Sequence, residues 1–178
     1  VSGVGTLTIT NSGGTTFSST VDASTVTLSN TTGAITFNGA VTAATLNTAA
    51  QAYSVALNAS SGTITNAVTF SNTGTVALGS SGGTQTYAGG ITATLPSATT
   101  VKGAINTNNA AISLGPVTLG ANTTLNTNAT SNVGDISLGA VTGSTYSLTL
   151  STGAVAGADV SGTSFTGTGT LTLDNIGG

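Results

Sequence analysis

The chain has 178 residues, and its charged side chains are four aspartates and one lysine, which give a formal net charge of −3. Histidine, cysteine and glutamate are absent. This composition excludes Ser-His-Asp triads, thiolate nucleophiles and the usual zinc ligand sets. One lysine cannot neutralise a phosphate backbone, and no apolar run is long enough for a membrane helix, so we expect neither nucleic-acid binding nor membrane insertion.

Short runs of alternating apolar and polar residues recur along the whole chain. A period of two is typical of strands with one buried face, and Thr and Val favour that conformation. Lys, Glu, Arg and Gln, the usual surface helix formers, are nearly missing. We therefore predict an all-β fold with short strands. The clearest runs, in chain order, are residues 6–10, 26–28, 35–37, 68–70, 112–114, 117–119, 136–138, 148–150 and 171–173.

A bulky residue recurs at a nearly constant spacing along the chain, nine times in all. A fixed period of about 20 residues is typical of repeat architectures, in which each unit packs only against its neighbours. The spacing therefore predicts a β-solenoid with coils of about 16–21 residues, in which these side chains stack as an internal ladder. The predicted ladder consists of Phe17, Phe37, Tyr53, Phe70, Tyr87, Ile105, Leu125, Tyr146 and Phe165.

Each predicted coil supplies about three apolar clusters, as three short strands and three corners would require. Pro96 and Pro116 should lie at corners or strand starts, because proline cannot donate to a strand ladder. At a strand spacing of about 4.8 Å, nine coils would form a rod roughly 43 Å long. The alternative fold is an antiparallel β-sandwich, which also has short strands but predicts no constant spacing of the aromatic residues.

Three segments have the same Gly/Thr/Val pattern: residues 33–42 (GAITFNGAVT), 85–92 (QTYAGGIT) and 134–143 (GDISLGAVTG). They resemble the repeats of filamentous-haemagglutinin-type and autotransporter-passenger-like bacterial surface proteins. The resemblance covers most of residues 33–178. It implies a right-handed parallel β-helix and roles in adhesion, biofilm matrix or surface fibres. No catalytic residue carries over from the repeat regions of that family.

The few charged residues offer little chemistry. Asp135 and Asp174 should lie near one face, two coils apart at roughly 10 Å, slightly beyond the carboxylate span of inverting glycosidases. Asp22 and Asp159 should face solvent or lie in turns, and Lys102 should lie at an exposed corner. Four scattered carboxylates do not make a calcium site. We therefore predict that the chain is not an enzyme and has no cofactor or metal site.

Strand-like sequence at 6–10 and 170–173 reaches almost to both termini, which favours a segment of a longer protein or a polymer. We predict that residues 1–178 form one repetitive segment of a non-enzymatic, extracellular structural or adhesive protein at a cell surface. Self-association, end to end or side by side, is expected, with host or matrix glycans as further partners. Two alternatives stay open: a surface-layer lattice protein, and a carbohydrate-binding module, which needs an exposed aromatic platform.

Overall fold

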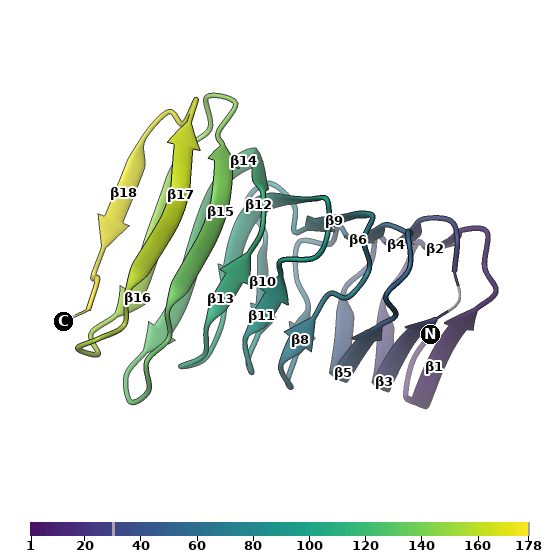
Figure 1. The fold of residues 1–178 in the computed structure, drawn as a ribbon. Helices are drawn as coiled ribbons and strands as arrows, with labels where there is room; N and C mark the ends of the chain where they lie inside the picture. Colours follow the sequence, from purple (N-terminus) through teal and green to yellow (C-terminus); the bar gives the residue numbers. More distant parts are fainter. Residues whose placement is uncertain (30, 178) are drawn as a thin grey trace.

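The computed structural model describes residues 1–29 and 31–177 as a stack of β-coils (Figure 1). Strand β1 (Val4–Thr10) and strand β18 (Leu171–Asp174) lie at opposite ends of the stack. About eight turns of about 21 residues each make up the described chain. All strand pairings among the described residues are parallel. The predicted β-solenoid is therefore confirmed, and the antiparallel β-sandwich is wrong.

Strands of successive coils stack into three faces, which we call A, B and C, so the expected three strands per coil are confirmed. Face A contains the starts of β1, β3 (Val21–Ser29) and β5 (Val41–Thr48), then β7 (Thr63–Ile64), β10 (Thr84–Tyr87), the ends of β12 (Ala98–Asn106) and β14 (Val117–Ala129), β16 (Leu148–Gly153) and β18.

Several strands of face A continue onto a second face, because they bend around a corner. Strands β12 and β14 begin on face B, and β1, β3 and β5 end on face C. Face B contains β2 (Thr15–Phe17), β4 (Ile35–Phe37), β6 (Val55–Leu57), β9 (Thr75–Leu78), the starts of β12 and β14, and the ends of β15 (Ile136–Thr142) and β17 (Val160–Thr166). Face C contains the ends of β1, β3 and β5, then β8 (Val68–Thr69), β11 (Ile91–Ala93), β13 (Ile112–Leu114) and the starts of β15 and β17.

The length of chain per coil changes along the stack. The paired residues Thr99 and Val117 are closer in sequence than the paired residues Thr123 and Leu148, so the second of these coils is longer. The difference lies in the corner loops, which the ladder between coils does not constrain. The average of about 21 residues is at the upper end of the predicted range. Eight turns at the strand spacing correspond to a stack roughly 38 Å long.

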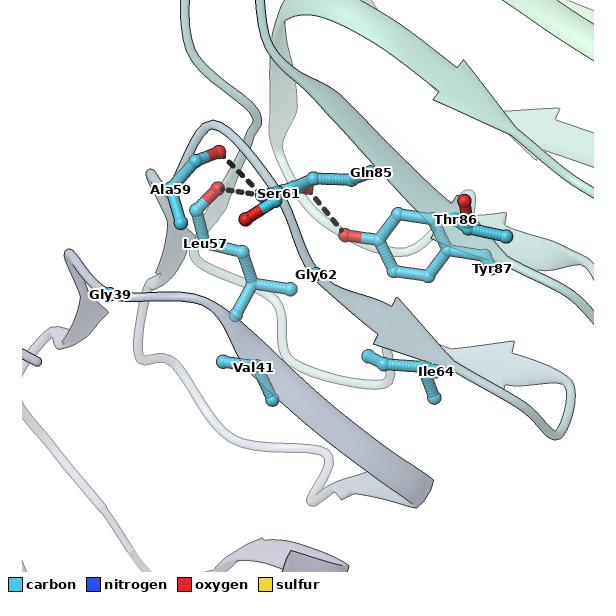
Figure 2. Close-up of a pocket in the computed structure, with 10 residues that line it drawn as sticks. All are labelled: Gly39, Val41, Leu57, Ala59, Ser61, Gly62, Ile64, Gln85, Thr86 and Tyr87. Atoms are coloured by element: carbon cyan, nitrogen blue, oxygen red, sulfur yellow. Dashed lines mark hydrogen bonds between the residues drawn. The ribbon is translucent and has the colours of Figure 1, made fainter. Parts of the chain in front are cut away.

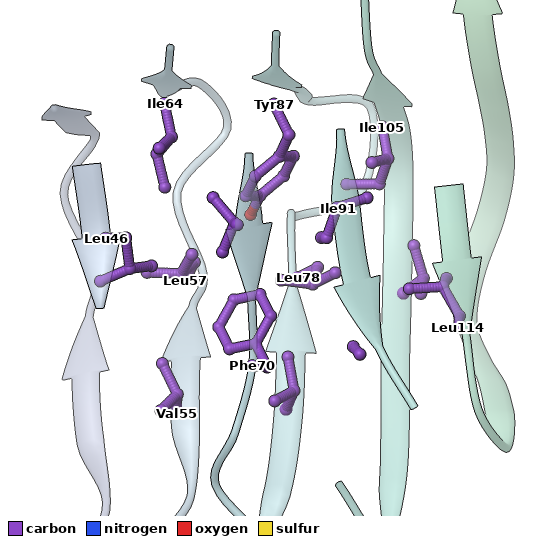
Figure 3. Packing of buried hydrophobic residues seen from close by; sticks show 14 of the residues in the cluster. Leu46, Val55, Leu57, Ile64, Phe70, Leu78, Tyr87, Ile91, Ile105 and Leu114 are labelled. Carbon is purple, nitrogen blue, oxygen red and sulfur yellow. The ribbon is translucent and has the colours of Figure 1, made fainter. Parts of the chain in front are cut away.

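The interior consists of columns of apolar side chains in register (Figure 3). A one-residue slip would turn a whole strand inside out, so burial of these columns fixes the register. Face B has two such columns. The first contains Phe17, Phe37, Leu57, Leu78, Val101 and Leu119. The second contains Ile35, Val55, Val76, Thr99, Val117, Val141 and Phe165.

The predicted nine-residue ladder is wrong as a single column. Phe17 and Phe37 do stack, with ring centroids 5.0 Å apart. The next residue in their column is Leu57, however, while Tyr53 lies in the loop before β6. The step from Phe37 to Tyr53 is shorter than the step from Phe37 to Leu57, which is the step that the ladder makes. The spacing of the aromatic residues is therefore close to the coil length, but it does not match the residue pairing between coils.

The other predicted ladder residues are distributed over all three faces. Ile105 and Leu125 share a column of face A, as predicted, whereas Tyr87 lies in another column, beside Ile64. Phe70 follows β8 on face C, where its backbone N–H donates to the carbonyl oxygen of Thr92. Because the corner loops differ in length, residues at similar sequence spacing lie in different columns.

The last two residues of the predicted ladder are less buried than the others. Tyr146 lies in the loop between β15 and β16 with 39% of its surface exposed. Phe165 is half-buried and pairs with Val141 on face B. Tyr146 follows a longer corner loop, which moves it out of phase with Leu125, whereas Phe165 lies on a different face. Tyr146 is therefore available for contacts outside the core.

Both prolines lie where the sequence predicted them. Pro96 is in the corner between β11 and β12, and Pro116 is in the corner between β13 and β14. The Pro116 carbonyl oxygen accepts a hydrogen bond from the backbone N–H of Thr99 on the neighbouring coil. Each proline thus lies where the strand ladder does not require a backbone N–H donor.

Thr99 is fully buried between Val76 and Val117 of the neighbouring coils. Its hydroxyl has no hydrogen-bond partner among the described residues. A buried hydroxyl without a partner destabilises the folded state, so we expect Thr99→Val to raise the free energy of unfolding by about 1–2 kcal/mol. Urea denaturation followed by circular dichroism measures this change.

Thr123→Val is the matched control for Thr99→Val. Thr123 is also buried, but its hydroxyl donates a hydrogen bond to the carbonyl oxygen of Ala121 at 3.0 Å. This control should lower the free energy of unfolding, because the carbonyl loses its partner. Equal effects of the two substitutions would contradict the hydrogen-bond assignment of Thr99.

Candidate functional site

The outer surface of the coils is covered mainly by hydroxyl and amide side chains. On face C, successive coils align five hydroxyl residues in one outward column: Thr69, Thr92, Ser113, Ser137 and Ser161. Asparagines join other columns by hydrogen bonds, as between Asn66 Nδ2 and Thr45 Oγ1 at 3.0 Å. Such cross-strand pairs each contribute a few tenths of a kcal/mol. The faces therefore offer a regular, largely uncharged hydrogen-bonding surface.

A buried polar cluster lies around Gln85 and Tyr87 (Figure 2). Gln85 Nε2 donates to the carbonyl oxygens of Leu57 at 2.8 Å and Ala59 at 3.1 Å, and the Tyr87 hydroxyl donates to Gln85 Oε1 at 3.0 Å. The cavity beside them has a volume of about 10 Å³. That volume holds about one water molecule at most. This cluster is therefore a structural feature of the core.

Burial raises the pKa of Tyr87 above its ordinary value of 10.0, and burial also raises the pKa of Tyr53. A raised folded-state pKa contributes stability below pH 10, and this contribution is lost as the pH rises above it. We therefore expect the free energy of unfolding to fall steeply between about pH 10 and pH 12. Tyr87→Phe should make that fall shallower. Urea denaturation at a series of alkaline pH values measures both slopes.

Tyr87→Phe should also destabilise the fold near neutral pH, by about 1–3 kcal/mol, because the buried Gln85 Oε1 loses its donor. Tyr146→Phe is the control, since the Tyr146 hydroxyl makes no hydrogen bond within the described residues. The control should unfold at the same urea concentration as the parent chain. A Tyr87→Phe variant as stable as the parent would contradict the hydrogen-bonded cluster.

A groove of about 690 Å³ lies at the corner between faces B and A. It crosses four successive coils. On its floor, one outward column runs from Thr84 through Ala104 and Thr124 to Thr149. We call this hollow the corner groove. It is lined by Ser81, Gly82, Gly83, Thr84, Gly103, Ala104, Ala121, Asn122, Thr123, Thr124, Tyr146, Ser147 and Thr149.

Among the coils that the groove crosses, the connection between faces B and A is shortest in β12. Five residues (79–83) join the paired positions of faces B and A in the β9–β10 coil, but only two residues (102–103) do so in β12. Gly103 has a φ of +70°, and a Cβ at this position would lie 2.5 Å from the Gly83 carbonyl oxygen. The floor is therefore low at Gly103, and the neighbouring loops form higher walls.

Tyr146 and Asn122 form the wall of the corner groove nearest to β16. A tight turn positions Tyr146, whose backbone N–H donates to the Gly143 carbonyl oxygen at 2.9 Å. Asn122 Oδ1 accepts a hydrogen bond from the backbone N–H of Ser147 at 3.0 Å, which orients the amide. The Asn122 Nδ2 group keeps its donors available, since no hydrogen bond of this atom occurs within the described residues.

The acidic residues do not meet at a common site. Asp135 accepts a hydrogen bond at Oδ1 from the backbone N–H of Asp159, at 3.0 Å, where face C begins. Asp174 instead pairs with Ser151 on face A, so the expected alignment of Asp135 with Asp174 is wrong. Asp135 precedes β15 at the start of face C, whereas Asp174 ends β18 on face A, so the two side chains lie on different faces. All four acids, Asp22 included, are exposed.

Lys102 lies at the corner between faces B and A, as the sequence predicted, but it is only half-exposed. Its side chain extends along the outside of the neighbouring coil, where a Cβ at Gly120 would come within 2.6 Å of Lys102 Cε. The aliphatic part of the lysine thus covers a glycine of the next coil, which is common for long charged side chains. It does not line the corner groove.

Sequence reasoning did not predict the corner groove. Its residues are glycines, threonines and serines that look like ordinary turn and strand residues, and the hollow depends on the difference in loop length between neighbouring coils. The one signal present was the spacing from Leu125 to Tyr146, which is the longest step of the predicted ladder. That spacing indicated a longer loop, and the loop is what exposes Tyr146.

Among residues 1–29 and 31–177, no group of three or more Asp, Glu, His or Cys side chains is arranged to hold a metal ion. The same part of the chain has no helix with the length and apolar character that crossing a membrane requires. Comparisons with protein-family models, with curated proteins and with solved structures found no match for this chain.

Proposed function

We propose that this chain is a non-enzymatic, extracellular scaffold: a stiff β-solenoid segment of a cell-surface adhesin or a self-assembling fibre of filamentous-haemagglutinin type. The observation that carries the proposal is the uninterrupted parallel ladder through about eight coils. Each coil contacts only its neighbours, so the fold extends in one dimension. Such a rod holds binding surfaces at a distance from its anchoring point and repeats weak contacts along its length.

The surface composition supports a scaffold more than a catalyst. A column of hydroxyl residues runs along face C, and charged residues make up only 3% of the chain. The near-total lack of Lys, Arg and Glu is unusual for a cytoplasmic protein, which supports an extracellular location. Many weak hydroxyl and amide contacts, acting together, are the proposed means of adhesion.

The end coils support association along the rod axis. Among the described residues, β17 and β18 pair only with β15 and β16, and their outer edges are unpaired. Leu171 and Leu173 of β18 are 39% and 58% exposed. An unpaired strand edge with apolar side chains is a template for another strand. We propose that a further coil, from the same protein or from another copy, continues the ladder there.

Negative-stain electron microscopy of the purified chain over a range of concentrations tests the scaffold proposal. We expect short rods that lengthen with concentration and keep a constant width. Ordered two-dimensional sheets would instead select the surface-layer lattice. Compact globules that remain monomeric at high concentration would contradict both.

A pair of lysine substitutions tests the role of the β18 edge. Leu173→Lys places a charge on the exposed edge and should reduce association, measured as the sedimentation coefficient at increasing concentration. Leu95→Lys is the control, because Leu95 is 59% exposed in the corner between β11 and β12, away from the stack ends. Equal loss of association in both variants would contradict an end-to-end contact at β18.

A further inference from the structure

The corner groove differs from the rest of the surface in having an exposed aromatic ring. Tyr53 and Tyr87 are 1% and 2% exposed, whereas Tyr146 is 39% exposed and lines the groove. Burial of the Tyr146 ring against the core would have been favourable, so its position at a groove wall leaves an apolar surface open to a ligand. The Tyr146 hydroxyl also makes no hydrogen bond within the described residues.

The other lining groups are hydrogen-bonding and uncharged. Thr84, Thr124 and Thr149 present hydroxyls from one column of the floor, and Asn122 Nδ2 offers donors from the wall. No charged side chain belongs to the lining. A neutral carbohydrate has the complementary chemistry, because its hydroxyls pair with hydroxyl and amide groups while the C–H face of a sugar ring packs on an aromatic ring. A nucleic acid or an acidic peptide would need cations that the lining lacks.

The size of the groove fits an oligosaccharide. Its volume of about 690 Å³ lies within the usual range for ligand sites in proteins. Its floor crosses four coils, which corresponds to a length of roughly 14 Å at the strand spacing. Backbone ladders hold every coil of the floor in place, so little of the binding free energy would be lost in ordering the site. The lining is therefore pre-formed for an extended ligand.

We infer that the corner groove is a binding site for a neutral polysaccharide chain, with Tyr146 as the stacking platform and the Thr84–Thr149 column and Asn122 as hydrogen-bonding partners. This inference rests on the proposed adhesive role and names the class of partner that the rod binds. The chain then adheres through a defined groove, and repeated segments of the same kind would add avidity.

Affinity gel electrophoresis with soluble polysaccharides tests the inference. The neutral probes are hydroxyethylcellulose, galactomannan and dextran, and the acidic probes are polygalacturonate and heparin. The chain is produced without N-glycosylation, because Asn122 begins an Asn-Thr-Thr sequon. We expect at least one neutral probe to retard the chain, and isothermal titration calorimetry then gives the dissociation constant. Retardation by the acidic probes alone, or by none of the five, would overturn the inference.

Variants at the groove separate binding from folding. Tyr146→Ala should weaken binding about tenfold or more, whereas Tyr146→Phe should keep it within about threefold, because the ring is retained. Leu95→Ala removes an exposed apolar side chain outside the groove and should bind like the parent chain. Circular dichroism of all three variants should match the parent. Unchanged binding by Tyr146→Ala would overturn the inference.

Rod morphology of the same samples keeps the two proposals apart. Rods without polysaccharide binding would reject the groove and leave the scaffold proposal standing. Polysaccharide binding by monomeric globules would reject the scaffold and would favour a carbohydrate-binding module.

Discussion

Phe37→Ala should lower the free energy of unfolding by about 3–5 kcal/mol, because it removes one of the largest fully buried side chains. Phe37 stacks on Phe17 with an angle of 6° between the ring planes, and Leu57 follows it in the same column. The rigid ladder on both sides prevents neighbouring coils from closing the space, so a cavity remains. Urea denaturation followed by circular dichroism measures the loss.

Phe17→Ala is the matched control for this prediction. It removes the partner of the same ring stack, but Phe17 is only half-buried in the first coil. Less apolar surface returns to water and one side of the new space is open, so we expect a loss of about 1–2 kcal/mol. Equal losses at Phe17 and Phe37 would contradict the position of Phe37 inside the stack.

Gly33→Ala should destabilise the fold by about 3 kcal/mol, because the coils approach each other most closely at glycines. A Cβ at Gly33 would meet the backbone carbonyl of Gly13 on the preceding coil. The added Cβ would clash with backbone atoms, and no flexible side chain can move away. The two coils would therefore have to separate locally. Separation would break ladder hydrogen bonds such as the one from Thr15 N–H to the Ala34 carbonyl oxygen, at 3.0 Å.

Gly13→Ala supplies the control for Gly33→Ala. It makes the same chemical change one coil earlier, where a Cβ would have no neighbour within 4 Å. The control should leave the midpoint of thermal unfolding within a few degrees of the parent, while Gly33→Ala should lower it clearly. If the two substitutions behaved alike, the close stacking of these coils would be contradicted.

The sequence predicts the architecture well because strand alternation and coil length are local properties. Runs such as Ile35–Phe37 and Ile112–Leu114 are strands with their apolar residues inside. Pro96 and Pro116 mark corners because their chemistry excludes them from strand interiors. The parallel arrangement follows from a repeat of about 21 residues, which brings each strand beside its counterpart one coil later.

The exact register could not be predicted, because it depends on corner loops that have little apolar pattern of their own. Phe37 and Tyr53 have the same kind of side chain at nearly the repeat distance, yet one lies in a strand and the other in a loop. Tyr53 is still buried, and its hydroxyl donates a hydrogen bond to the Leu28 carbonyl oxygen at 3.2 Å. Side-chain size alone does not distinguish these two positions.

The corner groove was also beyond sequence reasoning, for a related reason. Its floor depends on the two-residue connection at 102–103, and its wall depends on the loop that carries Tyr146. Neither feature has a motif, since both are differences between neighbouring coils. A feature of this kind becomes visible only when the coils are aligned by their hydrogen bonds.

Disulfide cross-linking is the most direct test of the central claim that consecutive coils stack in parallel register. The chain has no cysteine, so introduced pairs are unambiguous. Neighbouring strands lie about 4.8 Å apart, within the Cα separation that a disulfide spans. The register pairs Thr36 with Ala56, so Thr36→Cys with Ala56→Cys should cross-link in nearly every molecule. The control pair, Thr36→Cys with Ala52→Cys, has the same sequence separation as Phe37 and Tyr53 and should stay reduced. Efficient cross-linking of the control pair, or no cross-linking of the first pair, would contradict the stacked β-solenoid.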